Sequence, residues 1–369
     1  MSPAATAVPA RHPLNERSRN ERPVAYWLIA TAVMILLMVV IGGITRLTES
    51  GLSITEWKPV TGIVPPLTEA GWAREFAGYQ QIPQYRLMNA GMTLAQFKGI
   101  YFWEYVHRLW GRLIGLATVI PLIVFLVQGR VRRRRLVRLL AVPVLVGLQG
   151  VLGWYMVTSG FAQRTDVSQY RLTAHLILAV LIYGYLIWTA ADILRREPLW
   201  LDSAQAWRVR LISAAIVLLV LATMTAGGFT AGLHAGLTYN TFPLMDGRFF
   251  PDGYGALTPF WRNFFENVPA VQFDHRLLAE LTFCTILGFW LMARRRRCLP
   301  LSLRRPLNAL AIMACIQVLL GISTLIFVVP LPLAVTHQAG AVLLFTCAVL
   351  TLHAVSAPCK RRRRSDPAK

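Results

Sequence analysis

Tyr105-Val106-His107-Arg108-Leu109-Trp110 opens an apolar run that continues to Val127 and decides the fold of this 369-residue chain. The run holds the roughly 20 mostly apolar residues that a helix needs to cross a bilayer. It also carries a histidine, His107, about one turn inside its start. An ionisable side chain within a bilayer is costly and usually marks a site. The run therefore predicts both a membrane span and a functional residue on that span.

Similar runs recur along the whole chain. Hydrophobic residues make up 55% of the sequence and charged residues only 15%, and the charges gather between the apolar runs. This pattern predicts an all-α polytopic membrane protein with eight transmembrane helices. The expected spans are residues 25–44, 105–127, 139–157, 172–193, 209–228, 276–293, 307–328 and 333–353.

Lys and Arg residues gather on one side of the expected spans. That side receives both tails and the segments 128–138, 194–210 and 294–305, which together hold most of these residues. Because positive loops are retained in the cytoplasm, we expect this side, with both termini, to be cytoplasmic. The N-terminal tail has the features of neither a cleavable signal nor a mitochondrial presequence. A bacterial inner membrane is therefore the expected location.

The net charge of +21 comes from short basic blocks beside the spans. Examples are Arg132–Arg135, Arg294–Arg297 and Lys360–Arg364. Such blocks are typical of anchors to the lipids of an anionic leaflet, so we expect no nucleic-acid partner. The five cysteines have no CxxC spacing, which disfavours a thiolate metal site, and no disulfide is expected.

The chain contains an internal duplication. Each half holds four expected spans, an even number, so both halves enter the membrane in the same direction and should be related by an axis along the membrane normal. We therefore expect two parallel four-helix bundles, residues 25–193 and 209–353, with a cytoplasmic linker 194–208 and tails 1–24 and 354–369. The matching residues are Gly42–Thr45 with Gly227–Thr230, His107-Arg108 with His275-Arg276, Gln149 and Gly153 with Gln317 and Gly321, and His175 with His337.

Four of the seven histidines form two pairs through this duplication, His107 with His175 and His275 with His337. Each lies near the outer start of its span, and the two spans of a pair run in the same direction. A haem held between helices can take one imidazole from each, so the pairs predict two haem-iron sites toward the periplasmic face.

An arginine follows the first histidine of each pair. Arg108 and Arg276 lie nearer the interface than the histidines, and we expect their planar guanidinium groups to pair with haem propionates.

A simpler interpretation of each histidine is an interhelical hydrogen bond, which is common in membrane helices. Four histidines in register make this interpretation less favourable. His12 in the tail, His353 near an inner helix end and His234 in an outer loop stay unassigned. Of these three, His234 is the one that an outer loop could fold over a site.

Glu104 lies three residues before His107, whereas Gln272 occupies the matching position before His275. On a helix this spacing places Glu104 and His107 on one face. A glutamate here could also favour the helix dipole or pair with Arg108 or Arg112. Because Gln keeps the shape of Glu but cannot accept a proton, the difference favours proton chemistry at the first site and electron transfer at the second.

Three stretches of the sequence resemble the heme A synthase family. They are Gly42 to Ser53 (GGITRLTESGLS), the Trp57-Lys58-Pro59 and Gly62 to Pro66 stretch, and Glu104-Tyr105-Val106-His107-Arg108. The resemblance extends from about residue 25 to 353. The chain has no cysteine pair in an outer loop, so it resembles the branch of the family that lacks this pair.

The resemblance implies an enzyme that oxidises a methyl group of heme O to the formyl group of heme A for terminal oxidases. It implies that His107 and His175 hold the substrate haem, that His275 and His337 hold a permanent heme B cofactor, and that Glu104 is the acidic catalytic residue. Water is the expected oxygen source. Heme O synthase and oxidase assembly factors are possible partners by the logic of the pathway, and the oligomeric state stays open.

Two other classes of protein remain open. A quinol-linked, cytochrome b-like electron-transfer protein would hold two haems without modifying either, but the difference between Glu104 and Gln272 argues against it. A solute transporter would account for the repeat. It leaves the four registered histidines unexplained.

Overall fold

The computed structural model describes residues 21–58, 61–161, 164–195, 203–295 and 301–356. These residues form helices and turns, with one isolated β-bridge between Met245 and Arg248. Eight of the described helices are long and apolar enough to cross a membrane, which confirms the predicted polytopic all-α fold. The outer parts of both expected tails, His12 and residues 196–202 of the expected linker lie outside the described residues.

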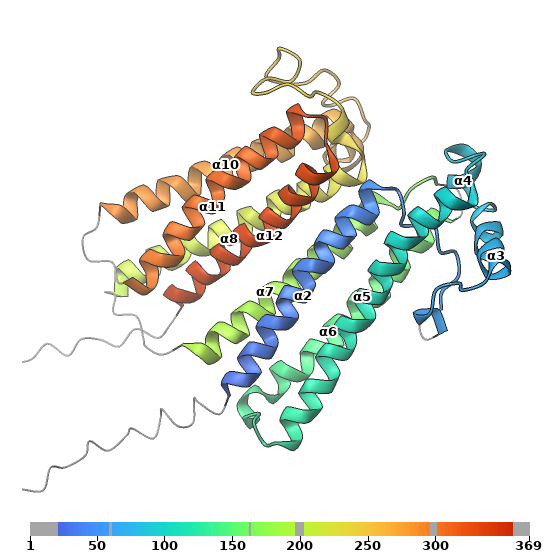
Figure 1. Ribbon diagram of the computed structural model, residues 1–369. Coiled ribbons are helices and arrows are strands. Elements are labelled where there is room, and N and C mark those ends of the chain that lie inside the picture. Colours follow the sequence, from blue (N-terminus) through green and yellow to red (C-terminus); the bar gives the residue numbers. More distant parts are fainter. Residues whose placement is uncertain (1–20, 59–60, 162–163, 196–202, 296–300, 357–369) are drawn as a thin grey trace, which may run out of the picture.

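The eight long helices are α2 (Arg22–Leu47), α5 (Leu94–Val127), α6 (Arg133–Val157), α7 (Gln169–Leu194), α8 (Ser203–Gly232), α10 (Val268–Arg294), α11 (Leu301–Ile326) and α12 (Leu331–Val355). Short helices occur in two connecting segments. They are α3 (Glu69–Tyr79) and α4 (Pro83–Leu87) between α2 and α5, and α9 (Asn263–Glu266) between α8 and α10. The end of the molecule that carries these two segments is called here the long-loop end (Figure 1).

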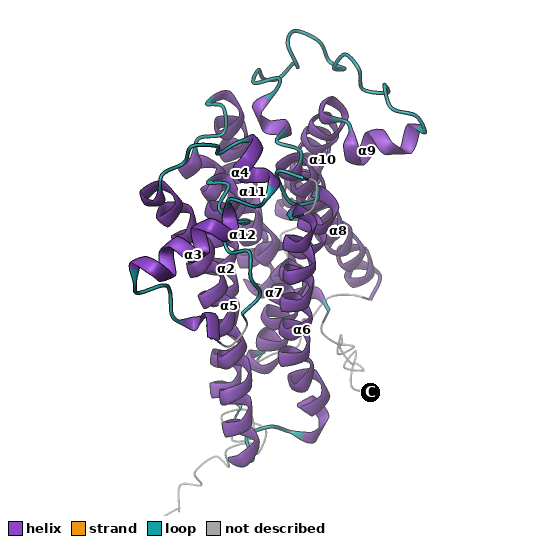
Figure 2. Cartoon of the chain, turned by 90° about the vertical axis from the view of Figure 1, so that its right-hand side faces the viewer, coloured by secondary structure: helices purple, strands orange, loops and turns teal. Residues whose placement is uncertain are grey.

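The long helices pack as two groups of four (Figures 1 and 2). In the first bundle, α2 and α6 each contact both α5 and α7; in the second, α8 and α11 each contact both α10 and α12. The bundles meet where α7 packs on α8 and α12, and where α12 also contacts α2. A Cβ at Gly184 of α7 would lie 2.7 Å from the Phe345 ring of α12, so glycine is what permits this close approach.

The second expected span is longer than its apolar run indicates. Helix α5 begins at Leu94 rather than near residue 105, after a capping box formed by Thr93 and Gln96. Its first turns bury Phe97 and Tyr101 against the α3 segment. His107 therefore lies more than three turns inside the helix instead of one. Hydropathy marked only the apolar part of α5, because its first turns are stabilised by the loop above the bundle.

Two other boundaries also differ from the expectation. Helix α8 begins at Ser203, inside the expected linker, and α11 covers Leu301–Ile326 rather than 307–328. Val328 and Val329 have φ of 59° and 56°, a left-handed conformation that ends the helix before the two prolines. At the start of α8, helical hydrogen bonding extends into polar residues before the apolar run. At the end of α11, it stops before the apolar run is complete.

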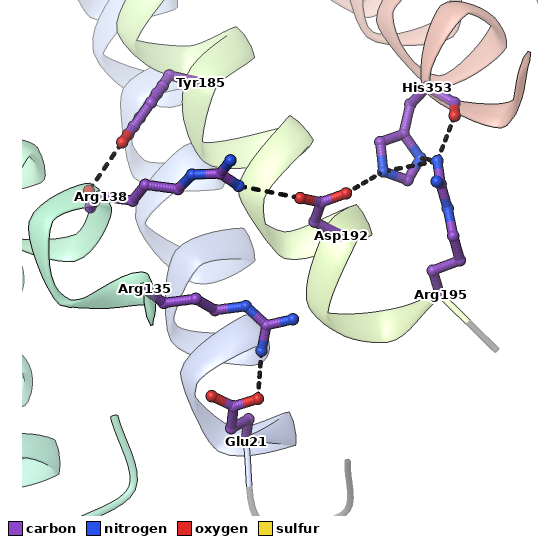
Figure 3. Close-up of polar contacts among 7 residues, drawn as sticks. All are labelled: Glu21, Arg135, Arg138, Tyr185, Asp192, Arg195 and His353. Carbon is purple, nitrogen blue, oxygen red and sulfur yellow. Dashed lines mark hydrogen bonds and ion pairs between the residues drawn. The ribbon is translucent and has the colours of Figure 1, made fainter. Parts of the chain in front are cut away.

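A polar cluster joins the two bundles at the end opposite the long loops (Figure 3). Asp192 of α7 accepts from Arg138 Nη1 at 3.1 Å and lies 3.1 Å from His353 Nε2 of α12. Arg195 donates to the carbonyl oxygen of His353. His353 is buried and packs edge-on against Trp188. The structure thus places His353 in a contact between bundles. The same view shows the ion pair of Arg135 with Glu21 and the hydrogen bond from Tyr185 to the carbonyl oxygen of Arg138.

Candidate functional site

A cavity of about 650 Å³ opens inside the first bundle toward the long-loop end. His107 of α5 and His175 of α7 both line it, together with Glu104 and Arg108. Its volume falls within the range of about 300–1,000 Å³ that is typical of ligand pockets. The two imidazoles are close enough that a charge on one would act on the other. The structure therefore brings the first histidine pair together at a single cavity.

Each imidazole of this pair rests against a glycine of the neighbouring helix. A Cβ at Gly42 of α2 would lie 3.0 Å from Cε1 of His107, and a Cβ at Gly153 of α6 would lie 2.9 Å from Cε1 of His175. Contacts this short leave no room for a larger residue without moving the ring. The two glycines thus set how deeply the imidazoles sit against the bundle wall.

The same contacts recur around the second histidine pair. A Cβ at Gly227 of α8 would lie 3.0 Å from Cε1 of His275, and a Cβ at Gly321 of α11 would lie 2.9 Å from Cε1 of His337. The structure thus places His275 and His337 in settings within the second bundle that match those of His107 and His175 in the first.

Glutamine side chains orient the second histidine of each pair. Gln149 Nε2 lies 3.1 Å from Nδ1 of His175 and donates to its carbonyl oxygen at 2.9 Å. Gln317 makes the same two contacts with His337, at 3.1 and 2.9 Å. Each amide nitrogen thus holds the histidine backbone and lies against the ring, which limits how far the imidazole can turn. The sequence pairs these glutamines through the expected duplication, but it predicts no role for them.

The first histidine of each pair differs in its hydrogen bonding. His275 Nδ1 lies 3.1 Å from the carbonyl oxygen of Thr223. His107 Nδ1 is buried without a hydrogen-bond partner among the described residues. A buried ring nitrogen without a protein partner is unfavourable, and its cost falls if the imidazole gains an external ligand.

The lining of the first cavity suits a porphyrin. Its inner walls are apolar, formed by residues such as Ile35, Val39, Ile114 and Ile182, whereas charged side chains gather at the long-loop end. Paired imidazoles from two parallel helices above apolar walls are the usual surroundings of a haem iron in a helical bundle. The residues present therefore fit a haem in this cavity.

Glu104 is buried and fully engaged by hydrogen-bond donors. Its Oε1 accepts from Arg108 Nη2 at 2.6 Å and from Nε at 3.0 Å. Its Oε2 accepts from Ser53 Oγ and from the Ile54 backbone N–H, both at 2.8 Å. An ionised carboxylate is an acceptor only, so this set of four donors suits the charged form.

Arg108 is engaged mainly by Glu104 and by the loop. Besides the ion pair, its Nη2 donates to the Ile54 carbonyl oxygen at 2.8 Å and its Nη1 to that of Glu56 at 3.2 Å. Pairing of Glu104 with Arg108 was one of the alternatives that the sequence left open, and the structure contains it. The guanidinium also lines the cavity, but most of its donors are directed to groups of the protein.

Gln272 makes a neutral version of the same arrangement in the second bundle. Its Nε2 donates to the carbonyl oxygens of Ala235 at 2.9 Å and Thr238 at 2.6 Å, and its Oε1 accepts from Arg276 Nη2 at 3.3 Å. Arg276 also donates to the carbonyl oxygen of Thr241 at 2.9 Å. The amide donates two bonds that a carboxylate could not. In both halves the side chain at this helix position binds the loop that follows the preceding long helix. It is an acidic residue, Glu104, in the first half and a neutral one, Gln272, in the second.

Residues from the second half of the chain complete the wall of the first cavity. Gln338 of α12 lines the cavity and donates to the Val39 carbonyl oxygen at 3.1 Å. His234, which follows α8, also lines the cavity, with Nδ1 3.3 Å from Arg46 Nη2. From the sequence His234 stays unassigned, and no role is predicted for Gln338, Arg46 or Ser53. The sequence contained one indication for His234, namely that an outer loop such as the one carrying it can fold over a site.

Comparisons with known proteins agree on one family for this chain. Residues 25–349 match the family model described as "Cytochrome oxidase assembly protein". The chain is 49% identical to the "Heme A synthase" of Parvibaculum lavamentivorans over 94% of this chain and 98% of that protein. It is 49% identical to that of Granulibacter bethesdensis, with 94% and 90% covered, and 47% identical to that of Nitrosomonas eutropha, with 90% and 93% covered.

The family-model match extends into all eight membrane helices and includes both histidine pairs. The family predicted from the motifs around Gly42 and Glu104 is thereby confirmed. This chain belongs to the heme A synthase family.

Proposed function

We propose that this protein is a heme A synthase, which oxidises one methyl group of heme O to a formyl group for the assembly of terminal oxidases. One observation carries the assignment of the reaction to the first bundle. Glu104 lines the cavity that holds the His107 and His175 pair, whereas Gln272 occupies the matching place in the second bundle. The relatives described above are named heme A synthase, which supports this activity.

In this proposal the first cavity binds heme O as substrate. His107 and His175 approach from parallel helices and act as the ligands of the substrate iron. The contacts of His107 with Gly42 and of His175 with Gly153 fix the positions of the rings. The apolar walls exclude water from most of the ring, while Glu104 faces the same cavity.

The proposed role of Glu104 is to accept a proton. Converting a methyl group and one water molecule into a formyl group releases four electrons and four protons, so a base close to the substrate assists the reaction. Arg108, Ser53 and the Ile54 N–H hold the carboxylate in place, and a carboxylate in its ionised form is able to accept a proton. In this proposal the formyl oxygen comes from water.

The second bundle is proposed to hold heme B between His275 and His337. This cofactor, when bound, supplies a one-electron carrier. The protein residues orient the ligands: Thr223 engages His275, and Gln317 engages His337. His337 and Gln338 are neighbours on α12, and Gln338 lines the first cavity, so a single helix borders both sites.

The proposal also includes the orientation of the protein in the membrane and the origin of its two halves by duplication. We place the long-loop end at the periplasmic face and both termini in the cytoplasm, because the basic blocks flank the opposite helix ends. The glycine contacts that recur at all four histidines support a duplication that produced bundles 25–193 and 209–353.

The test is to identify the haems that the protein carries and produces. The protein is expressed together with a supply of heme O, and the haems extracted from the purified protein are separated by chromatography. Heme A or its alcohol precursor, accompanied by heme B, is the expected result. Heme B alone would instead indicate a bis-haem electron-transfer protein, and no haem would exclude both functions.

The oxygen source requires a second measurement. The same expression in water labelled with heavy oxygen should place the label in the formyl group, as read by mass spectrometry of the extracted heme A. A reducing quench of the aldehyde to the alcohol before extraction prevents exchange of the label with solvent. Label arriving only from dioxygen would contradict the water route while leaving the activity itself in place.

A further inference from the structure

A second charged group lies at the long-loop end of the first cavity, apart from Glu104 and Arg108. Arg46 of α2, His234 after α8 and Asp166 in the loop before α7 all line the cavity. Arg46 lies four residues beyond Gly42, about 6 Å of helical rise toward the long-loop end from the level at which His107 rests. The group thus lies at the mouth of the cavity, above the histidine pair.

Arg46 has no carboxylate oxygen within ion-pair distance among the described residues, and the charges of Asp166 and Glu49 act on it only from farther away. Its Nη2 donates to the Ala231 carbonyl oxygen and lies 3.3 Å from His234 Nδ1. Asp166 instead lies 3.5 Å from the Arg164 guanidinium and 3.6 Å from the His234 ring. A half-buried guanidinium at a membrane cavity is costly without an anionic partner. Arg46 therefore has the charge and the location to receive an anion that enters the cavity.

His234 holds Arg46 in this position. Because a guanidinium only donates hydrogen bonds, His234 Nδ1 must act as the acceptor. The ring proton then lies on Nε2, which faces Asp166 Oδ2 at 3.6 Å. The backbone of His234 has φ of 53°, a left-handed conformation that turns the chain after α8. Arg46 of one bundle is thus oriented by a residue of the other.

This arrangement occurs at only one of the two described histidine pairs. Alignment of the halves by their glycine pairs places Ala231 opposite Arg46 and Glu49 opposite His234. Glu49 has the same φ as His234, 53°, but it carries a carboxylate where His234 carries an imidazole. The second bundle therefore has an alanine where the first has its cation.

We infer that Arg46, positioned by His234, binds a carboxylate on the edge of the porphyrin in the first cavity. The inference rests on the proposed function in one respect, that the ligand is a porphyrin. A porphyrin with two propionates carries them on one edge. With its iron between His107 and His175 and its apolar edge toward the inner walls, the carboxylate edge faces Arg46. The planar guanidinium suits this anion through charge-assisted hydrogen bonds.

The test compares a porphyrin diacid with its dimethyl ester. The full-length protein loaded with heme B is titrated in detergent with ferric protoporphyrin or with the dimethyl ester, and binding is followed by the Soret absorbance. Wild type should bind the diacid roughly tenfold more tightly, the effect of one charge-assisted contact. Arg46→Gln should bind both ligands equally, and Arg46→Lys should keep part of the difference.

Arg171→Gln is the matched control. Arg171 also lies near the long-loop end and donates to a backbone carbonyl oxygen, that of Tyr155 at 2.7 Å, but it does not line the cavity. This variant should keep the wild-type ratio. Heme B content and thermal stability, measured on every variant, show whether the protein is folded.

His234→Ala tests the positioning role. It should weaken diacid binding less than Arg46→Gln does and leave ester binding unchanged. A ratio of diacid to ester binding that stays at the wild-type value in folded Arg46→Gln overturns the inference but leaves the proposed function intact. If His107→Ala binds both porphyrins as wild type does, the cavity is not the porphyrin site, and the proposed function fails with the inference.

Discussion

Arg108 and Glu104 form a buried ion pair four residues apart on α5, with Arg108 Nη2 2.6 Å from Glu104 Oε1. The other carboxylate oxygen is held by Ser53 and Ile54, in the loop that leaves α2. Glu104 is therefore both the proposed base and the residue that fastens this loop to α5. The predictions below separate its chemical role from its structural role.

Glu104→Gln should retain haem binding but stop the conversion of heme O. The amide keeps the size of the side chain and resembles Gln272, but it cannot accept a proton. Formation of heme A is expected to fall by about 10²–10⁴-fold, the usual contribution of a general base. Chromatography of extracted haems should show heme O or its hydroxylated product accumulating. The exposed Glu56, as Glu56→Gln, is the control; an unchanged yield of heme A in Glu104→Gln would remove Glu104 from the mechanism.

Ser53→Ala should slow the reaction without abolishing it. The substitution removes one of the two hydrogen bonds to Glu104 Oε2, worth about 1 kcal/mol, so the rate of heme A formation is expected to fall roughly fivefold. Ser50→Ala is the matched control, because Ser50 is also buried in this loop but bonds to Thr48. Equal effects of the two substitutions would show that the loop, rather than the carboxylate, is what the Ser53 hydroxyl supports.

Alanine at the glycines behind the imidazoles should affect the two haem sites separately. Gly321→Ala is expected to displace His337 and reduce the heme B content, whereas Gly153→Ala should displace His175 and weaken binding of heme O alone. The pyridine haemochrome spectrum and a heme O titration measure the two effects. Gly147→Ala on α6 is the control, since nothing lies within 4 Å of a Cβ there. Loss of heme B in Gly153→Ala would contradict separate sites.

Asp192→Asn should lower stability and leave activity unchanged. It weakens the contact that joins α6, α7 and α12 at the end opposite the long loops (Figure 3). A partly exposed contact of this kind is worth up to about 1 kcal/mol, so Tm should fall by roughly 1 °C in a detergent melt. Asp252→Asn, which removes an exposed pair with Arg248, should leave Tm unchanged. A large loss of heme A formation in Asp192→Asn would indicate a role beyond packing.

Asp166 should stabilise the folded protein at neutral pH, and this stabilisation should be lost in acid. The His234 ring 3.6 Å away, assisted by Arg164, holds the pKa of this loop carboxyl below its ordinary value of about 3.9. A lowered pKa in the folded state favours folding above the ordinary value, and that contribution disappears as pH falls through the folded pKa. Tm of wild type should therefore exceed that of Asp166→Asn at pH 6, and the two should converge below about pH 4. A constant difference across this range would assign the effect of Asp166 to packing.

Much of the architecture could be predicted because a bilayer imposes a simple requirement. Backbone groups in lipid must be paired within a helix, so each span has to be about 20 mostly apolar residues long, and such runs are visible in the sequence. The first turns of α5 were missed for the opposite reason. They lie outside the apolar run and are stabilised by burial of Phe97 and Tyr101 under the α3 segment.

The candidate site divides in the same way. The pairing of His107 with His175 and of His275 with His337 was predicted from the proposed duplication, in which equivalent helices present equivalent faces. The partners of Glu104 did not follow, because Ser53 is distant in sequence and reaches the carboxylate only through the path of a loop. Arg108 was expected to face a propionate, and the structure shows it engaged by Glu104 as well.

The sequence by itself determined the eight spans, the two histidine pairs, the family and the difference between Glu104 and Gln272, because each depends on residue type and spacing along one helix. Only the tertiary structure decided that His234 and Gln338 of the second half complete the cavity of the first, and that Arg46 lies at its mouth without a carboxylate partner among the described residues. Contacts between helices distant in sequence depend on how two bundles pack, and the apolar pattern of a single helix does not encode that packing.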